Sequence, residues 1–288
     1  MANLDYFYLI STFLYGLVIG SFLNVCIYRL PREGLSIIRP SSFCPNCKSP
    51  IQWYYNIPLF SFIILRGRCS NCAARISFRY PLVELITGCL FVLAASIYLI
   101  PYINSGDVSK LIRFILSVYL IGILIVVTFI DIEFRIIPDE LTISGIVLAL
   151  LASIFFPAIH KPIASQLPGF LNGLISSVIG IITGGGIIYL IGLIGKLIFR
   201  KEAMGFGDVK LMAFLGGFLG WEPTLYTFFV ACLLGSIIGI ILYFITKDHY
   251  IAFGPYIAMA ALITLFFEFH IIYLIQQYQE LIRHLIIN

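Results

Sequence analysis

Long apolar stretches separated by short polar connections dominate the chain from one end to the other. Crossing a bilayer as a helix takes about 20 consecutive apolar residues. We expect membrane spans of this kind at residues 6–28, 81–101, 111–130, 140–158, 170–198, 223–245 and 251–274. A further, shorter apolar helix is expected at 210–220, where glycines are frequent. The pattern predicts an all-α polytopic membrane protein with about eight transmembrane helices, the sixth of them short.

The composition points to the same class. Hydrophobic residues make up 60% of the 288 residues, and only 11% are charged. Soluble domains carry roughly 25% charged residues. The first 28 residues lack a basic leading segment and contain an apolar run long enough to span a bilayer, so we expect a retained helix and not a cleaved signal peptide. The low share of charged residues excludes an ordinary soluble domain.

The charged residues gather between the first two spans, at 29–80. This segment holds eight Lys and Arg and one Glu, a net charge of +7. Basic connections stay on the cytoplasmic side of a membrane. We therefore expect the 29–80 loop and the connections at 131–139, 199–210 and 246–250 to be cytoplasmic, with both termini on the other side. Three basic residues run against this orientation: Lys110, Arg113 and Lys161.

Four of the seven cysteines form two CxxC pairs inside the basic loop, Cys44–Cys47 and Cys69–Cys72, with 21 residues between the pairs. Two such turns facing each other supply the four thiolates of a tetrahedral Zn²⁺ site, and four protein ligands make the site closed and structural. Cytoplasmic thiols stay reduced, which favours metal over disulfides. The sequence therefore predicts a cytoplasmic zinc-binding loop. Zinc ribbons also bind nucleic acid, but this loop is tied to the membrane at both ends, and its basic residues suit anionic lipid headgroups.

Two aspartates stand at the edges of apolar runs. Asp208 follows two glycines in Gly205–Asp208, and Asp131 ends the third expected span. An ionisable residue at membrane depth usually has a function, and the expected topology puts both carboxylates at the cytoplasmic face. Two close carboxylates share one proton, so that one acts as general base and the other as general acid. We expect Asp139, after a proline, to cap a helix. The four histidines are scattered along the chain, so the sequence suggests no catalytic set of the Ser-His-Asp or Cys-His kind.

Two polar residues near the cytoplasmic ends of spans have two readings each. Asn24 suits either an interhelical hydrogen bond or a substrate site. Glu84 either lies near the N-terminus of its helix, where a negative charge is favoured, or faces a site. Gly16 and Gly20 are four residues apart, a spacing that lets another helix pack closely against the first span.

An ordered set of motifs resembles the type IV prepilin peptidases. The matching pieces, in chain order, are Gly20–Val25, Tyr28–Pro31, both CxxC pairs, Leu65–Cys69, Arg79–Glu84, Asp131–Asp139, Gly205–Lys210 and Phe253–Pro255. The resemblance implies a polytopic aspartic endopeptidase of the bacterial cytoplasmic membrane. It would cut prepilins or pseudopilins after a glycine that ends a basic leader, with Asp131 and Asp208 as the catalytic pair.

The resemblance also implies a second activity. Family members with the cysteine loop methylate the new N-terminal residue with S-adenosylmethionine, and Asn24 and Glu84 are the candidates for this work here. The expected parts are a first span at 1–28, a zinc loop at 29–80 that serves methyl transfer together with its flanking spans, and a peptidase core at 81–288. The alternatives are a peptidase without methyl transfer and a transporter with a zinc module, since intramembrane carboxylates also couple protons.

Overall fold

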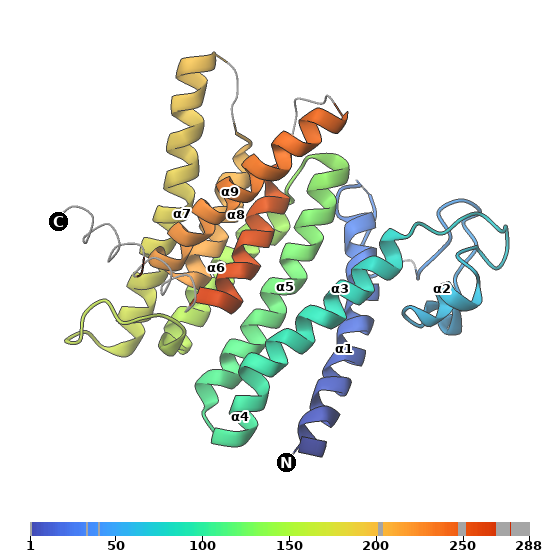
Figure 1. Cartoon of the computed structure of the whole chain (residues 1–288), viewed down its shortest axis with the longest axis horizontal. Helices are drawn as coiled ribbons and strands as arrows, with labels where there is room; N and C mark the ends of the chain where they lie inside the picture. The colour runs from blue at the N-terminus through green and yellow to red at the C-terminus, as the bar shows by residue number, and fades with distance from the viewer. Residues whose placement is uncertain are drawn as a thin grey trace. The chain divides into compact units, whose positions relative to one another are not determined.

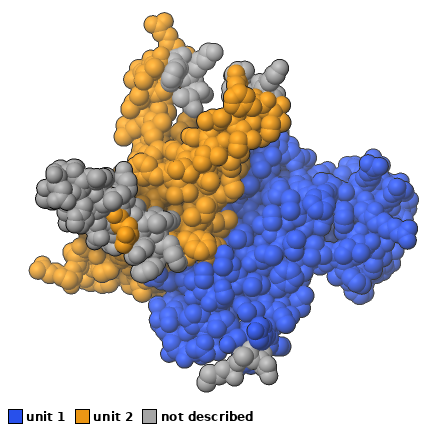
Figure 2. Space-filling model, viewed as in Figure 1, with its two compact units in different colours: residues 1–138 blue, residues 139–288 orange. Residues whose placement is uncertain are grey.

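The computed structural model describes residues 2–32, 34–39, 41–200, 204–246, 252–268 and 277. The chain forms two compact units, residues 1–138 and 139–288 (Figure 2). Within the described residues the regular structure is helical, and two isolated β-bridges, Phe43 with Pro50 and Arg68 with Arg75, are the only strand-like pairings.

Three long helices build the first unit: α1 (Ala2–Arg29), α3 (Arg79–Ala94) and α5 (Val108–Phe134). A π-helical turn continues α3 into α4 (Ile100–Ser105), so the apolar segment from residue 79 to 105 is unbroken. The basic loop between α1 and α3 contains a 3₁₀ turn, Trp53–Asn56, and the short helix α2 (Phe60–Ile64). Figure 1 shows α1 and α3 side by side, with the α2 loop at one end of the pair.

Local chemistry marks the boundary between α4 and α5. Gly106 takes a left-handed conformation with φ of 71° and ends α4, as glycine commonly does after a helix. The side chain of Asp107 then accepts a hydrogen bond from the Ser109 backbone N–H at 3.0 Å and caps α5. The turn is therefore specified by two adjacent residues whose types suit it.

Glycines let α1 and α3 approach closely. A Cβ added to Gly16 would lie 2.8 Å from the Gly88 Cα, and one added to Gly20 would lie 2.7 Å from the Glu84 Cα. No side chain fits in that space. The predicted close approach at Gly16 and Gly20 is confirmed, and its consequence is that the backbone of Glu84 rests directly on α1.

The second unit contains α6 (Asp139–Phe155), α7 (Gly169–Phe199), α8 (Phe206–Leu219), α9 (Trp221–Thr246) and a helix at Gly254–Glu268. The helices α7 and α8 pack through glycines: a Cβ on Gly180 would lie 2.0 Å from the Gly216 carbonyl oxygen. The Ser177 hydroxyl also donates to the Gly217 carbonyl at 2.9 Å. Small residues allow both the close contact and the hydrogen bond between helices.

Five of the described helices are long and apolar enough to cross a membrane, and they are Leu4–Arg29, Arg79–Ser105, Val108–Phe134, Gly169–Ile198 and Trp221–Ile245. The helices α6, α8 and Gly254–Glu268 are shorter. The predicted class, an all-α multi-pass membrane protein, is confirmed. Of the last expected span, 251–274, residues 251 and 269–274 lie outside the described residues. Residues 247–250 of the expected connection at 246–250 also lie outside them.

Lys161, one of the basic residues on the side predicted to be non-cytoplasmic, lies in an ion-pair network. Its ammonium is 3.1 Å from a Glu222 carboxylate oxygen and 3.0 Å from a Glu268 oxygen. Desolvation acts to lower the pKa of Lys161, but the hydrogen bonds and charges of the two glutamates outweigh it and raise the pKa. The positive charge is thus locally balanced by two carboxylates.

Candidate functional site

The four cysteines of the basic loop come together as predicted. Their sulfur atoms all lie within 4.8 Å of one another, and the Cys44 and Cys72 sulfurs are 3.9 Å apart. Zinc–sulfur bonds of about 2.3 Å in a tetrahedron require sulfur–sulfur distances of about 3.8 Å. The cluster therefore fits a Zn²⁺ ion, and Cys44, Cys47, Cys69 and Cys72 could hold it.

The two CxxC pairs fold into matching turns. The Lys48 N–H donates to the Cys44 carbonyl at 2.9 Å, and the Ala73 N–H donates to the Cys69 carbonyl at 3.0 Å. Lys48 and Ala73 both adopt the left-handed conformation, with φ of 59° and 58°. Each β-bridge of the fold closes one of these turns. The two halves of the metal centre are therefore structural repeats of each other.

Two asparagines connect the turns through the sulfurs. The Asn46 side-chain amide donates to the Cys72 sulfur at 3.7 Å, and the Asn71 amide donates to the Cys47 sulfur at 3.8 Å. Donors at these positions stabilise thiolate charge. Neither asparagine is among the residues predicted from the sequence to serve the metal site, although both occupy the third position of their motifs, CPNC and CSNC, and this shared position was the available signal.

The thiols of the cluster differ in acidity. A hydrogen bond from the Ser49 hydroxyl, with help from the Ser49 backbone, lowers the pKa of Cys47 to about 6. Backbone N–H groups of Cys72 and Asn71 lower the pKa of Cys69. Burial raises the pKa of Cys44 to about 11. Because metals bind thiolates, part of the ligand set is ready to bind at neutral pH and Cys44 must lose its proton on binding.

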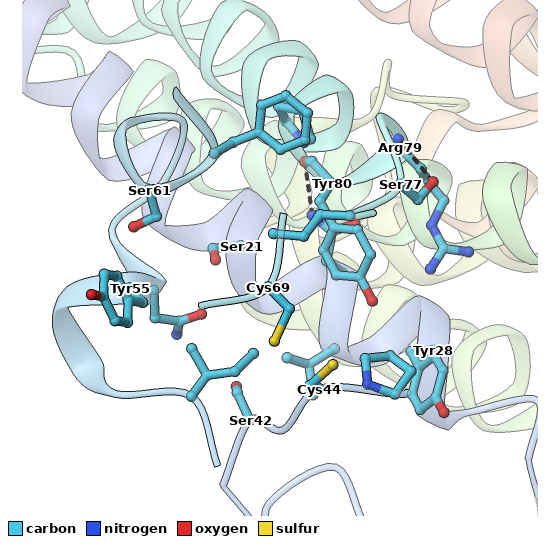
Figure 3. A pocket seen from close by; sticks show the side chains of 18 of the residues that line it. Ser21, Tyr28, Ser42, Cys44, Tyr55, Ser61, Cys69, Ser77, Arg79 and Tyr80 are labelled. Carbon is cyan, nitrogen blue, oxygen red and sulfur yellow. Dashed lines mark hydrogen bonds between the residues drawn. The ribbon is translucent and has the colours of Figure 1, made fainter. Parts of the chain in front are cut away.

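A cavity of about 560 Å³ lies between α1, α3 and the basic loop, entirely within the first unit (Figure 3). Asn24, Glu84 and Arg79 line it, together with the aromatic rings of Tyr28, Phe43, Tyr55, Phe62 and Tyr80. Cys44 and Cys69 also line it, so the metal cluster forms one wall. The structure thus brings the two polar candidates, Asn24 and Glu84, into one cavity.

Asn24 and Glu84 are both buried, at 1% and 7% exposure. The Asn24 amide donates to the Tyr80 carbonyl at 3.0 Å, which makes the interhelical hydrogen bond one of its roles. A Glu84 carboxylate oxygen accepts the Leu59 N–H at 2.8 Å. Leu59 holds a positive φ of 59°, which is uncommon outside glycine. Glu84 therefore anchors a strained point of the loop onto α3.

Three arginines that line the cavity, Arg29, Arg32 and Arg79, have different partners. Arg29 donates to the Ser36 carbonyl at 2.8 Å and so holds the start of the loop. Arg32 lies 3.7 Å from a Glu133 carboxylate oxygen, and Arg79 pairs with the other oxygen of Glu133. Glu133 falls in the 131–139 segment, which the apolar pattern predicts to be a connection between spans. The structure corrects this: Glu133 lies in the last turn of α5 and joins that helix to α3.

The two candidate catalytic aspartates lie at helix ends and are buried. Asp131 is in the last turn of α5 with 6% exposure, and Asp208 is in the first turn of α8 with 8% exposure. Helix N-termini favour carboxylates, and C-termini disfavour them. The helix ends therefore act oppositely on the two groups. A Cβ on Gly205 would lie 3.4 Å from an Asp208 carboxylate oxygen, so glycine keeps this space free.

The two aspartates belong to different compact units, and their predicted pairing stays a prediction. Asp139 differs from expectation. It is the first residue inside α6 and does not precede the helix as a cap, and its carboxylate forms an ion pair with Lys210. The helix N-terminus still favours its charge. Lys210 therefore has a partner within the second unit.

Comparison with known proteins decides the class. The family model of the bacterial peptidase A24 N-terminal domain matches residues 14–98, and that of the type IV leader peptidase family matches residues 118–240. The chain belongs to the type IV leader peptidase family. This confirms the family resemblance and makes the chain an enzyme, an aspartic peptidase by family.

Several curated proteins named prepilin leader peptidase/N-methyltransferase are similar to this leader peptidase. One from Aeromonas hydrophila is 36% identical over 91% of this chain and 92% of its own length. One from Neisseria gonorrhoeae is 35% identical over 83% of this chain and 84% of its own length. One from Klebsiella pneumoniae is 38% identical over 76% of this chain and 88% of its own length. No solved structure matches the chain.

The family matches divide this leader peptidase differently from its compact units. The N-terminal match contains the zinc cluster, Asn24 and Glu84, whereas the leader peptidase match contains both Asp131 and Asp208. Along the chain, the boundary between the compact units follows residue 138, which lies inside the leader peptidase match. The predicted functional parts, 1–28, 29–80 and 81–288, stay a prediction, as do the roles of the individual residues.

Proposed function

We propose that this leader peptidase is bifunctional. It cleaves the leader from type IV prepilins or pseudopilins at the cytoplasmic face of a bacterial inner membrane, and it then methylates the new N-terminal residue with S-adenosylmethionine. The observation that carries the proposal is a pair of buried aspartates at helix ends, Asp131 and Asp208, in a chain of an aspartic leader peptidase family. The names of the similar proteins support the second activity.

For the cleavage step, we propose Asp131 and Asp208 as the acid–base pair. One carboxylate takes a proton from the water that attacks the scissile carbonyl, and the other, protonated, gives its proton to the leaving amine. Two carboxylates near one water divide in this way because like charges disfavour double ionisation. A prepilin, with its hydrophobic helix behind a basic leader, would place its cleavage site where the spans meet water.

The metal and the membrane surface have supporting roles in the proposal. Zn²⁺ held by the four cysteines would brace the basic loop without taking part in cleavage, since a site with four protein ligands leaves no position for a reacting water. The basic residues of the loop would contact anionic lipid headgroups.

S-adenosylmethionine supplies the methyl group when bound, and Asn24 and Glu84 are the proposed residues that hold it. We propose no nucleic-acid partner.

The cleavage proposal is tested by two isosteric substitutions, Asp131→Asn and Asp208→Asn. Each removes a group that gives or takes a proton, and general acid–base groups contribute about 10²- to 10⁴-fold in rate. We expect each variant to lose prepilin cleavage by at least about 10²-fold while retaining zinc. Asp107→Asn is the control, because asparagine caps a helix as well as aspartate does. Intact cleavage in either catalytic variant would refute the aspartyl pair.

The second activity is tested on the same preparation. Purified protein is incubated with prepilin and S-adenosylmethionine labelled on the methyl group, and the label on the cleaved pilin is measured. We expect cleavage followed by label transfer. Cleavage without transfer would leave a peptidase whose zinc loop is only structural. The transporter alternative is not favoured, because both family matches describe peptidases.

A further inference from the structure

We propose that the cavity between α1, α3 and the basic loop is the binding site of the methyl donor, and that Asn24, Arg79 and Glu84 bind its polar groups. This inference rests on the methyltransferase half of the proposed function and gives it a place in the molecule. Figure 3 shows the cavity with Arg79, Tyr80 and the two sulfurs of Cys44 and Cys69 around it.

Two buried polar atoms of the cavity residues have no partner among the described residues. They are the side-chain oxygen of Asn24, an acceptor, and the Nε of Arg79, a donor. The Asn24 amide nitrogen already donates to two carbonyls, of Tyr80 and Gly20, so its orientation is set and the oxygen is left over. Leaving such an atom unsatisfied costs about 1–3 kcal/mol. An acceptor and a donor on the lining of one cavity indicate a ligand that both gives and takes hydrogen bonds.

The charges of the lining match a ligand with charges of both signs. Glu84 offers a buried carboxylate, and Arg79 offers a guanidinium of which only one edge is used by Glu133. Arg29 is occupied with backbone carbonyls, and Arg32 with Tyr28 and Glu133. Arg75 also lines the cavity but is exposed. Arg79, whose side chain is only 18% exposed, is therefore the cation best placed to serve a ligand inside the cavity. The methyl donor carries a carboxylate for Arg79 and cationic sulfonium and ammonium groups for Glu84.

The size and the rings of the cavity suit a nucleoside with a side arm. About 560 Å³ falls within the roughly 300–1,000 Å³ of small-molecule sites. Five aromatic rings line it, Tyr28, Phe43, Tyr55, Phe62 and Tyr80, and such rings stack on nucleobases and attract cations. An anionic lipid headgroup is the rival ligand of this basic region. It fits less well, because the buried Glu84 carboxylate would repel its phosphate.

Because Cys44 and Cys69 form one wall, the metal centre is part of this site. Glu84 also holds Leu59 of the loop, and Asn24 holds Tyr80 at the start of α3. The same side chains that would bind the donor therefore fix the loop over it. Donor binding should depend on an intact loop.

The test is calorimetric titration of the zinc-loaded full chain in detergent with S-adenosylmethionine and with S-adenosylhomocysteine. Glu84→Gln keeps the shape and an acceptor for the Leu59 N–H but removes the charge. Arg79→Lys keeps the charge but removes Nε, and Asn24→Leu removes the free acceptor. We expect each to raise Kd about tenfold or more, since each loses a buried polar contact. Thr87→Val is the matched control: Thr87 is buried on α3 near Glu84 but does not line the cavity, and its Kd should change by less than about twofold.

The outcomes separate the inference from the proposed function. If wild-type protein binds the donor and transfers label, but Glu84→Gln and Arg79→Lys bind it with unchanged Kd, the site lies elsewhere and only the inference falls. If the wild type neither binds donor nor transfers label, the methyltransferase activity itself falls. Zinc content and thermal unfolding verify folding, and the two conservative variants decide the case if Asn24→Leu does not fold. Displacement of the donor by phosphatidylglycerol, with no effect of Glu84→Gln, would assign the cavity to a lipid and overturn the inference.

Discussion

Both compact units use glycines to bring a helix with a buried carboxylate against its neighbour, but the contact lies at different places. In the first unit, Gly20 touches the backbone of Glu84 itself. In the second, Gly180 and Gly184 of α7 meet Gly216 and Met212 of α8. These contacts lie one to two helical turns beyond Asp208. Close packing of the helices therefore fixes the position of Glu84 directly. In the second unit, close packing fixes the middle of α8, and the space around Asp208 at the start of α8 depends on Gly205.

A second difference is what completes each carboxylate's surroundings. Glu84 is held by a loop that a metal cluster organises, through the Leu59 N–H. Asp208 stands in the first turn of a helix, where the backbone itself favours a negative charge. The first unit should therefore be sensitive to metal, and the second to the packing of α7 on α8.

Metal removal should have the largest effect and should act on the first unit. Chelation, or the substitution Cys72→Ser, takes away a ligand set whose binding supplies folding free energy, about 10–16 kcal/mol in small zinc peptides. We expect loss of bound zinc and rapid proteolysis within residues 41–77, with loss of donor binding. Zinc analysis and limited proteolysis measure this. Cys89→Ser is the control, because Cys89 is exposed and outside the cluster. A loop that stays protease-resistant without zinc would contradict the role of the metal.

The packing of the second unit is tested by Gly180→Ala. The added Cβ would lie 2.0 Å from the Gly216 carbonyl oxygen, and backbone cannot move aside as a side chain can. Forcing the helices apart should cost about 1–3 kcal/mol or more and lower the unfolding temperature and prepilin cleavage together. On the same helix, Gly186→Ala meets nothing within 4 Å and should be nearly neutral. Equal thermal stability of the two variants would show that this contact is not tight.

The corresponding test in the first unit is Gly20→Ala, which should have a smaller effect. Its Cβ would lie 2.7 Å from the Glu84 Cα, so a shift of a few tenths of an ångström relieves more of the clash. We expect a loss of about 1–2 kcal/mol and weaker methyl-donor binding, measured by thermal unfolding and calorimetry. Gly122→Ala, with its nearest neighbour at an ordinary 3.8 Å, is the control. Unchanged donor binding in a destabilised Gly20→Ala protein would separate the helix contact from the cavity.

The smallest expected effect concerns a single thiol in zinc-free protein. With a lowered pKa, Cys47 is a thiolate at pH values above about 6, and its alkylation should be half-maximal near that pH, whereas Cys44, with a pKa of about 11, should react last. Ser49→Ala removes the hydroxyl at 2.9 Å from the Cys47 sulfur and should move the midpoint upward. Mass spectrometry after alkylation at several pH values gives both midpoints. An unchanged midpoint in the Ser49 variant would exclude the hydroxyl as the cause.

The sequence by itself determined the membrane class, the approximate position of the spans and the cysteine ligand set. These features depend on local patterns: apolar length decides whether a helix spans a bilayer, and the two CxxC turns repeat the same short backbone fold. The close approach at Gly16 and Gly20 was also predictable, because it needs only small residues one turn apart. The motifs, taken in their order along the chain, also predicted the protein family correctly.

Only the tertiary structure decided which polar groups meet. The partner of Asn24 is the Tyr80 carbonyl, 56 residues away, and that of Glu84 is the Leu59 N–H, 25 residues away. Glu133, in a segment expected to be a connection between spans, lies at the end of α5 and pairs with Arg32 of the basic loop and Arg79 of α3. Hydrogen bonds and ion pairs between distant segments follow from how helices and loops pack, and no periodicity along the chain encodes them. The cavity that joins Asn24 to Glu84 and the metal cluster is therefore a property of the fold.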